Sequence, residues 1–278
     1  MTQTEPLGIL AGAGRVPMIA ARIARRNGRS VVAVQLAETE QDKLSSLADH
    51  CLTESLGQVG AILDFYRKHD VREVLFIGKV PKQLHFAEIQ FDEVALSMLA
   101  RLPGRTDSSI FGVIANEMTS RGMIIASQIE VLSDLLAPNG HLAGPPPSQE
   151  MLNDIQLGLQ AANRLTDLDI GQTVVVARGA VVAVEAFEHT DATIQRAGKL
   201  AGTDLVAVKV ARPQQDPRFD VPTVGAIMLA TLRRAGGVCL AVEAGKTLMI
   251  EPKRMQSYAQ RYKITLMGIS RDFSGGNA

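Results

Sequence analysis

Leu7-Gly-Ile-Leu-Ala-Gly-Ala-Gly-Arg-Val-Pro17 is the stretch that decides the fold of the first half of the chain. Its apolar segment Leu7–Ala11 predicts a short buried strand, which the glycines of Gly12-Ala-Gly14 interrupt. Val16–Asn27 then predicts a helix with proline in its first turn and Gly28 as its C-cap. A strand that turns through glycines into a helix is typical of a parallel α/β sheet.

The same alternation of strand and helix continues along the chain. Ser30–Leu36 and Glu73–Ile77 predict further buried strands, with an amphipathic helix at Gly57–His69 between them. Continuous apolar strands separated by helices predict a doubly wound sheet with right-handed crossovers. Further elements are expected at Glu88–Leu102 (helix), Ser108–Arg121 (helix) and Met123–Ser127 (strand).

The composition changes near residue 138, where proline and glycine become frequent. We therefore expect a Rossmann-like N-terminal domain at 1–138, a linker at 139–148 and a C-terminal α/β domain at 149–278. In the second domain, Thr173–Arg178 and Ala180–Phe187 predict two strands joined tightly at Gly179. The fold class is thus α/β with two domains, a parallel sheet followed by a mixed one.

Bulk properties exclude several classes of function. The 278 residues carry 29 basic and 29 acidic side chains, and so lack the basic excess that nucleic-acid binding needs. The N-terminus has no signal-peptide pattern, and no apolar run approaches the roughly 20 residues of a membrane span. Two distant cysteines fit a reducing compartment. We expect a cytoplasmic protein.

The stretch from Ala207 to Gly225 carries the strongest chemical signal. An apolar strand runs into a loop bracketed by Pro217 and Pro222, which favour an extended or turned backbone. In an extended chain alternate side chains share a face, which would bring Asp216, Arg218 and Asp220 together. Two carboxylates around a guanidinium suit a divalent cation and a phosphate.

Two charged residues lie in segments that otherwise predict buried strands. Glu185 follows Val-Val-Ala-Val directly, and Lys209 shares a strand face with Leu205 and Ala207. Buried charges need partners, so we predict a salt bridge between Glu185 and Lys209. The alternative is an edge strand that leaves Lys209 in water.

Five carboxylates would form a site of the all-oxygen character that Mg²⁺ prefers: Glu185, Glu188, Asp191, Asp216 and Asp220. The alternative for Asp191, and for Thr190, is a helix cap. The scattered histidines argue against zinc.

Several turns are candidate anion sites. Gly12 and Gly14 stand before a helix, although Pro17 replaces the third glycine of the dinucleotide fingerprint. Lys79 follows a strand at its ligand-binding end. Simpler interpretations stay open, namely a tight turn and a surface lysine. Three further residues precede helices, with capping as the alternative for the first: Asp107, Thr223 and Gly225. Glu38 is a candidate ribose contact.

Six sequence blocks resemble one known family. They are LGILAGAGRVP, GKVPK, DIGQTVVV, AVEAFEHTDATIQRAG, VKVARPQQDPRFDVPTVG and LAVEAGKTL, in this order from end to end. Together they resemble the UDP-2,3-diacylglucosamine pyrophosphatases of the LpxI type, which serve lipid A assembly. The resemblance implies two α/β domains with the substrate bound in the cleft between them. It also implies Mg²⁺-dependent hydrolysis to UMP and 2,3-diacylglucosamine 1-phosphate, with water attacking the phosphorus on the sugar side.

The chain departs from the family pattern at three places. The family's Glu-Gly-Thr-Asp reads Glu188-His189-Thr190-Asp191, and a usual pair of aspartates reads Thr106-Asp107. The run after Gly225 is more apolar than usual. These changes keep open a nucleotide-sugar-binding protein without catalysis. An alternative of another class, a Rossmann-type oxidoreductase, rests on the N-terminal α/β domain, and the incomplete glycine pattern counts against it.

The predicted roles follow from the two lines of argument together. Asp216 and Asp220 act as metal ligands or catalytic carboxylates, while Lys209 and Arg218 neutralise pyrophosphate charge. Substrate-binding candidates are Gly12, Gly14, Lys79, Asp107, Thr190, Gln215, Thr223 and Gly225. The lipid-linked substrate implies work at the surface of the inner membrane, as a peripheral protein, and a homo-oligomer stays open. An acyl surface or core packing would equally explain Met98, Leu99, Met118, Met123, Met228 and Leu229.

Overall fold

The computed structural model describes residues 5–275 except 38, 40–42, 80–88 and 103–106, and leaves out the side chains of 107–111. The chain forms two compact units. The N-terminal unit holds Met1–Leu132 together with Pro217–Phe219, and the C-terminal unit holds Ser133–Asp216 and Asp220–Ala278. The expected division into two α/β domains is therefore confirmed.

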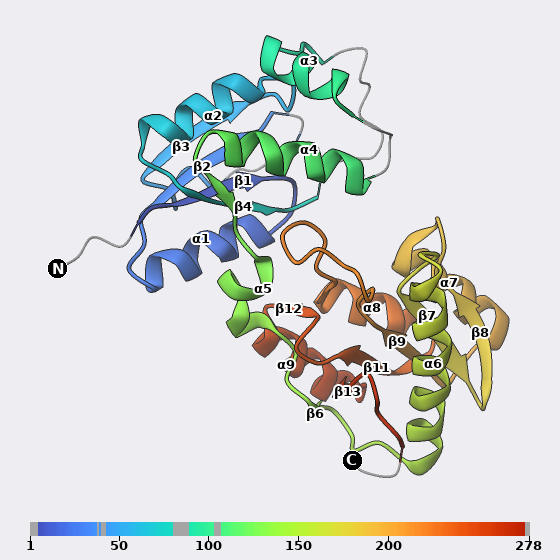
Figure 1. Ribbon diagram of the computed structural model, residues 1–278. Coiled ribbons are helices and arrows are strands. Elements are labelled where there is room, and N and C mark those ends of the chain that lie inside the picture. Colours follow the sequence, from blue (N-terminus) through green and yellow to red (C-terminus); the bar gives the residue numbers. More distant parts are fainter. Residues whose placement is uncertain (1–4, 38, 40–42, 80–88, 103–106, 276–278) are drawn as a thin grey trace. The chain divides into compact units, whose positions relative to one another are not determined.

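The N-terminal unit is built on a parallel five-stranded sheet with the order β3-β2-β1-β4-β5. In this order the chain builds the sheet outward from β1 in one direction and then from β4 in the other, and open α/β sheets bind their ligands at such a switch in strand order. Helix α1 lies on one side of the sheet, and α2 and α4 lie on the other (Figure 1). The elements are β1 (Leu7–Ala11), α1 (Val16–Arg26), β2 (Val31–Leu36), β3 (His50–Glu54), α2 (Val59–Lys68), β4 (Glu73–Ile77), α3 (Glu93–Ala100), α4 (Asp107–Ser120), β5 (Ile124–Ile125) and α5 (Gln128–Val131).

The strand at β3 was not predicted. Its sequence, His-Cys-Leu-Thr-Glu, contains only two apolar residues and no regular alternation, and none of its residues is fully buried. A strand at the edge of a sheet has one neighbour and little apolar surface to cover, so its sequence carries a weak signal.

The C-terminal unit is built on a six-stranded mixed sheet with the order β6-β13-β11-β9-β7-β8. Strands β9, β11 and β13 are parallel, and β7 pairs antiparallel with β9 and β8. The antiparallel pair that we predicted at Gly179 is thereby confirmed. The elements are β6 (Gly140–Ala143), α6 (Gln149–Asp167), β7 (Thr173–Ala177), β8 (Ala180–Val184), α7 (His189–Ala201), β9 (Leu205–Lys209), β10 (Thr223–Gly225), α8 (Ala226–Arg234), β11 (Gly237–Glu243), β12 (Leu248–Ile250), α9 (Pro252–Tyr262) and β13 (Thr265–Ile269).

Alternate residues of the central strands divide between two hydrophobic layers. Val206 and Val208 of β9 pack in the layer that contains residues of α6. Leu205 and Ala207 pack in the layer that contains residues of α7, α8 and α9. This period of two places the last residue of β9, Lys209, on the α7 side of the sheet.

The segment expected to be a linker belongs to this sheet. Gly140–Ala143 forms β6, which pairs antiparallel with β13, and the C-terminal unit begins at Ser133 by its contacts. Proline and glycine predicted a linker here, but an edge strand also accommodates them. The cleft between the domains stays a prediction.

Within the described part of the chain, no helix is both long and apolar enough to cross a membrane.

Candidate active site

The most unusual feature of the C-terminal unit is a pair of buried charges at the carboxyl end of β9. Lys209 and Glu185 are only 7% and 8% exposed. The hydroxyl of Thr190 connects them, because Lys209 Nζ donates to Thr190 Oγ1 over 2.8 Å and Thr190 Oγ1 donates to Glu185 Oε1 over 2.8 Å. The structure thus joins Glu185 and Lys209 through the hydroxyl of a third residue, while the direct salt bridge between them stays a prediction.

The aspartate loop leaves the sheet directly after this pair. It is turned at residues 213–214 and again at 217–219, and the Asp220 amide donates to the Asp216 carbonyl over 3.3 Å. Of the two predicted backbones, extended or turned, the loop adopts the turned one, so the alternation of an extended chain does not place Asp216, Arg218 and Asp220 on one face. The turn instead brings the backbones of Asp216 and Asp220 together at its base.

Hydrogen bonds within the C-terminal unit hold the base of the loop. Gln215 Oε1 accepts from the Arg212 amide and from Gln172 Nε2, at 3.0 Å each. The Nε2 of Gln215 is buried and has no hydrogen-bond partner among the described residues. The side-chain oxygen of Gln215, a predicted substrate contact, therefore stabilises the loop, and its side-chain nitrogen is the atom that could donate to a ligand.

Arg212 was missed by sequence reasoning. Its guanidinium lies 2.9 Å from Asp169 and 3.6 Å from Asp220. The sequence offered a signal, because Arg212 lies inside the conspicuous block VKVARPQQDPRFDVPTVG. It adds a positive charge beside one of the two candidate aspartates.

The tip of the loop, Pro217–Phe219, belongs to the N-terminal unit. Gln128, only 4% exposed, donates from its backbone amide to the Pro217 carbonyl (2.8 Å). Its side chain donates to the carbonyls of Phe76 (2.7 Å) and Arg218 (3.4 Å), and the ring of Phe219 packs edge-on against Phe76. The guanidinium of Arg218 lies 5.3 Å from the centroid of the Phe219 ring. The turn between the two aspartates is therefore held by a residue distant in sequence.

A second buried carboxylate, Glu243, fixes the start of the loop. It ends β11, is 5% exposed, and accepts from the Ala211 amide over 2.8 Å. Arg271 lies 3.8 Å from the same carboxylate oxygen and donates to the Ala211 carbonyl. Sequence reasoning did not select Glu243, although it lies within the block LAVEAGKTL.

The remaining candidate carboxylates are not gathered around the loop. Glu188 pairs with Arg196 at 2.5 Å, and this hydrogen bond lowers the pKa of Glu188. Asp191 is exposed in the first turn of α7. Across the described residues, no three His, Cys, Asp or Glu side chains lie close enough together to hold a metal ion. The five carboxylates are thus not gathered into one such group among the described residues, and a magnesium site stays a prediction.

His189, where the family pattern has glycine, adopts φ of +67°. This left-handed region favours glycine, so the position is one that a glycine would fill without strain. The imidazole is exposed, and its ring lies 6.5 Å from that of Phe187. None of the contacts that join Glu185, Thr190 and Lys209 involves the imidazole.

Thr223 and Gly225 follow the aspartate loop in the sequence. They form β10, which pairs with β12, and Gly225 is the N-cap of α8. The predicted position before a helix is confirmed, and Thr223 is exposed to solvent.

In the N-terminal unit the glycine turn and Lys79 lie together. Ala13 and Lys79 exchange two backbone hydrogen bonds, of 2.7 and 2.9 Å, at the ends of β1 and β4. A Cβ on Gly12 would lie 2.6 Å from the Lys79 carbonyl oxygen, whereas Gly14 has φ of +103°. The backbone of the predicted glycine turn is thus held in place by Lys79, and anion binding there stays a prediction. The side chain of Asp107 and the residues Glu38 and Thr106 lie outside the part that is described.

We expect Gly12→Ala to destabilise the protein, because the added methyl group meets backbone atoms that cannot move aside. The free energy of unfolding should fall by about 1–3 kcal/mol. Gly112 is the matched control, since it lies in α4 with open space around its Cα. Gly112→Ala should raise stability by up to about 1 kcal/mol. Urea unfolding of both variants checks the opposite signs, and equal effects would contradict the close approach.

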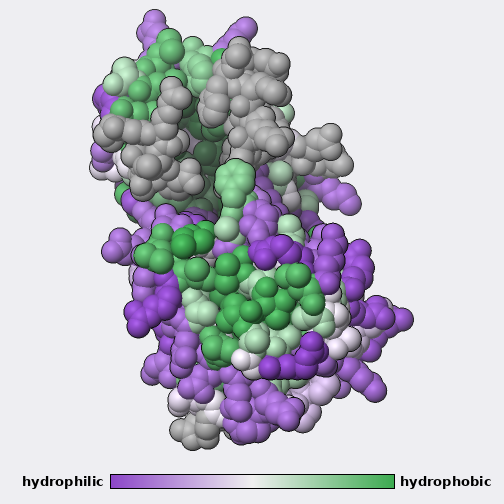
Figure 2. All heavy atoms as spheres, turned by 90° about the vertical axis from the view of Figure 1, so that its right-hand side faces the viewer, coloured by the Kyte–Doolittle hydropathy of each residue, from purple (hydrophilic) through white to green (hydrophobic). Residues whose placement is uncertain are grey.

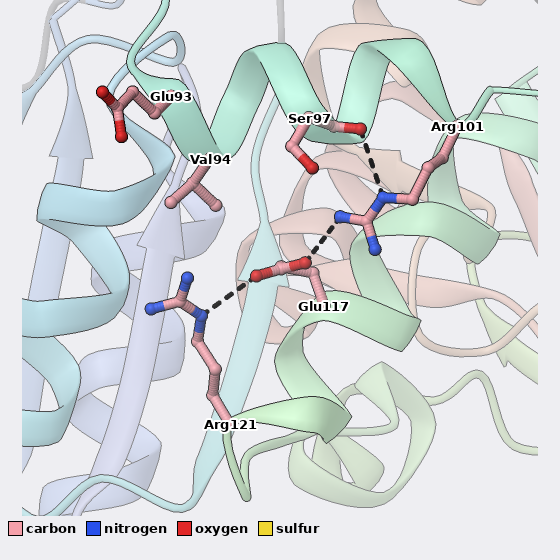
Figure 3. Close-up of a pocket in the computed structure, with 6 residues that line it drawn as sticks. All are labelled: Glu93, Val94, Ser97, Arg101, Glu117 and Arg121. Carbon is pink, nitrogen blue, oxygen red and sulfur yellow. Dashed lines mark hydrogen bonds and ion pairs between the residues drawn. The ribbon is translucent and has the colours of Figure 1, made fainter.

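A shallow hollow between α3 and α4 is lined by charged residues (Figure 3). Glu117 accepts from Arg101 over 2.7 Å and from Arg121 over 3.0 Å. The hydrogen bond from Arg101 is the main cause that holds the pKa of Glu117 below its ordinary value of 4.5. These residues join α3 to α4.

This cluster predicts a pH dependence. Because the folded-state pKa of Glu117 is lowered, its contribution to stability is complete above the unfolded-state pKa and is lost as the pH falls through the folded-state value. Wild type should exceed Glu117→Gln in unfolding free energy at neutral pH by no more than about 1 kcal/mol, since the arginines are partly exposed. Denaturant unfolding near neutral pH and in acid checks this, and a gap that widens in acid would contradict it.

The proposed acyl-lining residues mostly belong to the core. Leu99 is 43% exposed, but five of the six are buried: Met98, Met118, Met123, Met228 and Leu229.

Both halves of the chain match models of known domains. The model of the LpxI N-terminal domain matches residues 6–135, and that of the LpxI C-terminal domain matches residues 138–267. The chain belongs to the LpxI family. A relative from Caulobacter vibrioides, named UDP-2,3-diacylglucosamine pyrophosphatase LpxI, is 28% identical over 274 residues, which are 95% of this chain and 97% of the relative. The family assignment thus covers both domains.

Solved structures show only a distant likeness. N5-carboxyaminoimidazole ribonucleotide synthetase from Thermotoga maritima is 13% identical with a TM-score of 0.24, over 66% of this chain and 42% of that one. A biotin carboxylase from Campylobacter jejuni is 13% identical with a TM-score of 0.27, over 72% and 42%. Neither carries an argument about the LpxI fold or its site.

Proposed function

We propose that this protein hydrolyses the pyrophosphate bond of UDP-2,3-diacylglucosamine, releasing UMP and 2,3-diacylglucosamine 1-phosphate for lipid A synthesis. The match of both LpxI domains along the chain carries the proposal. The activity is the one named for the Caulobacter relative, which aligns over nearly its whole length. The buried Lys209 beside the aspartate loop supplies a chemical reason for it.

Positive charge at the carboxyl edge of the C-terminal sheet suits a pyrophosphate. Lys209 lies at the end of β9, and Arg212 follows in the loop beside Asp220. A cation held in place before the reaction stabilises the charge that develops on phosphate oxygens. Lys209 and Arg212 are therefore proposed to bind the pyrophosphate, and Asp216 or Asp220 to accept the proton of the attacking water.

The oxygen of water forms a bond to the phosphorus on the sugar side, and the bond from that phosphorus to the bridging oxygen breaks. UMP leaves with the bridging oxygen, while the sugar phosphate keeps the oxygen of water. The aspartate holds the proton taken from water and passes it to solvent.

Mg²⁺ is the proposed cofactor, and when bound it would offset the negative charge of the two phosphates. The described carboxylates do not gather into a metal-binding group, so none of the steps above runs through the ion. Activity with added Mg²⁺ and with a chelator tests this part separately.

Work at a membrane surface is also proposed, because the substrate is a lipid. Figure 2 shows apolar side chains gathered on the side of the C-terminal unit where α7 and β8 lie. Val181 of β8 is 42% exposed and Phe187, just after it, is 90% exposed. Exposed apolar groups of this kind suit contact with acyl chains.

The position of bond cleavage tests the proposed reaction. Hydrolysis in water enriched in oxygen-18 should place the label in 2,3-diacylglucosamine 1-phosphate and leave UMP unlabelled, as mass spectrometry of both products would show. Label in UMP would contradict attack on the sugar side.

A further inference from the structure

The hydroxyl of Thr190 lies at the centre of a buried polar network in the C-terminal unit. Besides Lys209 and Glu185, it contacts the hydroxyl of Thr173 at 3.4 Å. Thr173 is fully buried. The network therefore joins three buried side chains through the half-buried Thr190, and the numbers of donors and acceptors decide which hydrogen bonds each side chain can make.

The proton count assigns the direction of each hydrogen bond. An ammonium group can only donate and a carboxylate can only accept, so Thr190 Oγ1 accepts from Lys209 and gives its single hydrogen to Glu185. Thr173 must then be the donor in its contact with Thr190. The hydroxyl of Thr190 has no hydrogen left for a ligand, which argues against its predicted role as a substrate contact.

The fold explains why the four residues meet. Thr173 and Lys209 are paired partners in β7 and β9, and the Glu185 amide donates to the Thr173 carbonyl over 2.8 Å. Thr190 approaches from the first turn of α7, the helix that packs on this side of the sheet. Its hydroxyl thus ties the start of α7 to the ends of two strands.

We propose that Thr190 is a positioning residue that fixes the ammonium group of Lys209 for the pyrophosphate of the substrate. This inference rests on the proposed function. Glu185 supplies the compensating charge through Thr190, and its second oxygen, Oε2, has no hydrogen-bond partner among the described residues. Without the bridge, the ammonium group of Lys209 loses a hydrogen bond that orients it, and the two buried charges lose the hydroxyl that joins them.

Two substitutions at residue 190 separate the hydroxyl from the shape of the side chain. Thr190→Val keeps the shape and removes the hydroxyl, whereas Thr190→Ser keeps the hydroxyl. With UDP-2,3-diacylglucosamine, Thr190→Val should lower kcat by about tenfold or more, the scale of a lost hydrogen bond to a charged group, with little change in KM. Thr190→Ser should stay close to wild type.

Thr193→Val is the matched control. It removes another buried hydroxyl of α7, one that donates only to the His189 carbonyl, and it should leave kcat unchanged. Wild-type kcat in Thr190→Val, or a raised KM with unchanged kcat, would overturn the positioning role.

A second measurement does not depend on the reaction. Protons on the Lys209 ammonium should exchange slowly with water in an NMR experiment on ¹⁵N-lysine-labelled protein, with the signal assigned by its loss in Lys209→Met. The signal should persist in Thr190→Ser and be lost in Thr190→Val, and its persistence in Thr190→Val would overturn the inference. If the wild-type protein released no UMP, the proposed function would be refuted. The NMR experiment would still test the role of Thr190, because it does not depend on the reaction.

Discussion

Asp220→Asn should lower turnover of UDP-2,3-diacylglucosamine by about 100-fold or more, the scale of a lost general base. Asp216→Asn should have a similar effect, because the backbone bond at the base of the turn holds both residues together. Asparagine keeps the shape of aspartate and removes the charge. The surface contact of Asp220 with Arg212 contributes at most about 1 kcal/mol, so the fold should survive.

Asp204→Asn is the control for these variants. Asp204 lies just before β9, at the end of the strand opposite to the loop, and pairs on the surface with Arg178. It should keep wild-type kcat, and circular dichroism should show all three variants folded. Near-normal hydrolysis by both loop variants would remove the aspartates from the mechanism.

Lys209→Met should strongly lower turnover and also destabilise the protein. Methionine fills the space of the lysine stem but leaves Glu185 as a buried carboxylate without its compensating charge. Breaking a buried charge pair in this way costs about 3–5 kcal/mol in unfolding free energy. Activity should fall by about 100-fold or more, because a fixed positive charge beside the pyrophosphate is lost.

The double variant Lys209→Met/Glu185→Gln separates the two effects. Neutralising Glu185 should restore much of the stability, since no unpaired charge remains, while activity should stay low. Urea unfolding and the turnover assay, applied to both variants and wild type, check this. Recovery of activity together with stability would show that Lys209 matters only for folding.

The order of elements was predictable because the strands of the two central sheets are continuous apolar runs. Leu7–Ala11 and Glu73–Ile77 form strands with the predicted bounds. The two buried charged residues, Glu185 and Lys209, were also predictable, because they interrupt these apolar runs. The edge strands β3 and β6 were not predicted, because little of their surface is buried and their sequences therefore lack an apolar pattern.

The residues that hold the site were harder to predict. Gln128 is a glutamine in a short helix, and nothing in its neighbours marks it as a partner of the loop some 90 residues later. Glu243 and Arg212 act through partners brought near by the fold. Local sequence patterns report burial and turns, whereas such contacts depend on how distant segments pack.

The decisive measurement for the proposed hydrolysis is the amount of UMP that the purified protein forms from UDP-2,3-diacylglucosamine. We expect UMP and 2,3-diacylglucosamine 1-phosphate in equal amounts, and a rate at least about 100-fold lower in Asp220→Asn. Tight binding of the substrate with no UMP released, with or without Mg²⁺, would contradict it and leave a nucleotide-sugar-binding protein in its place.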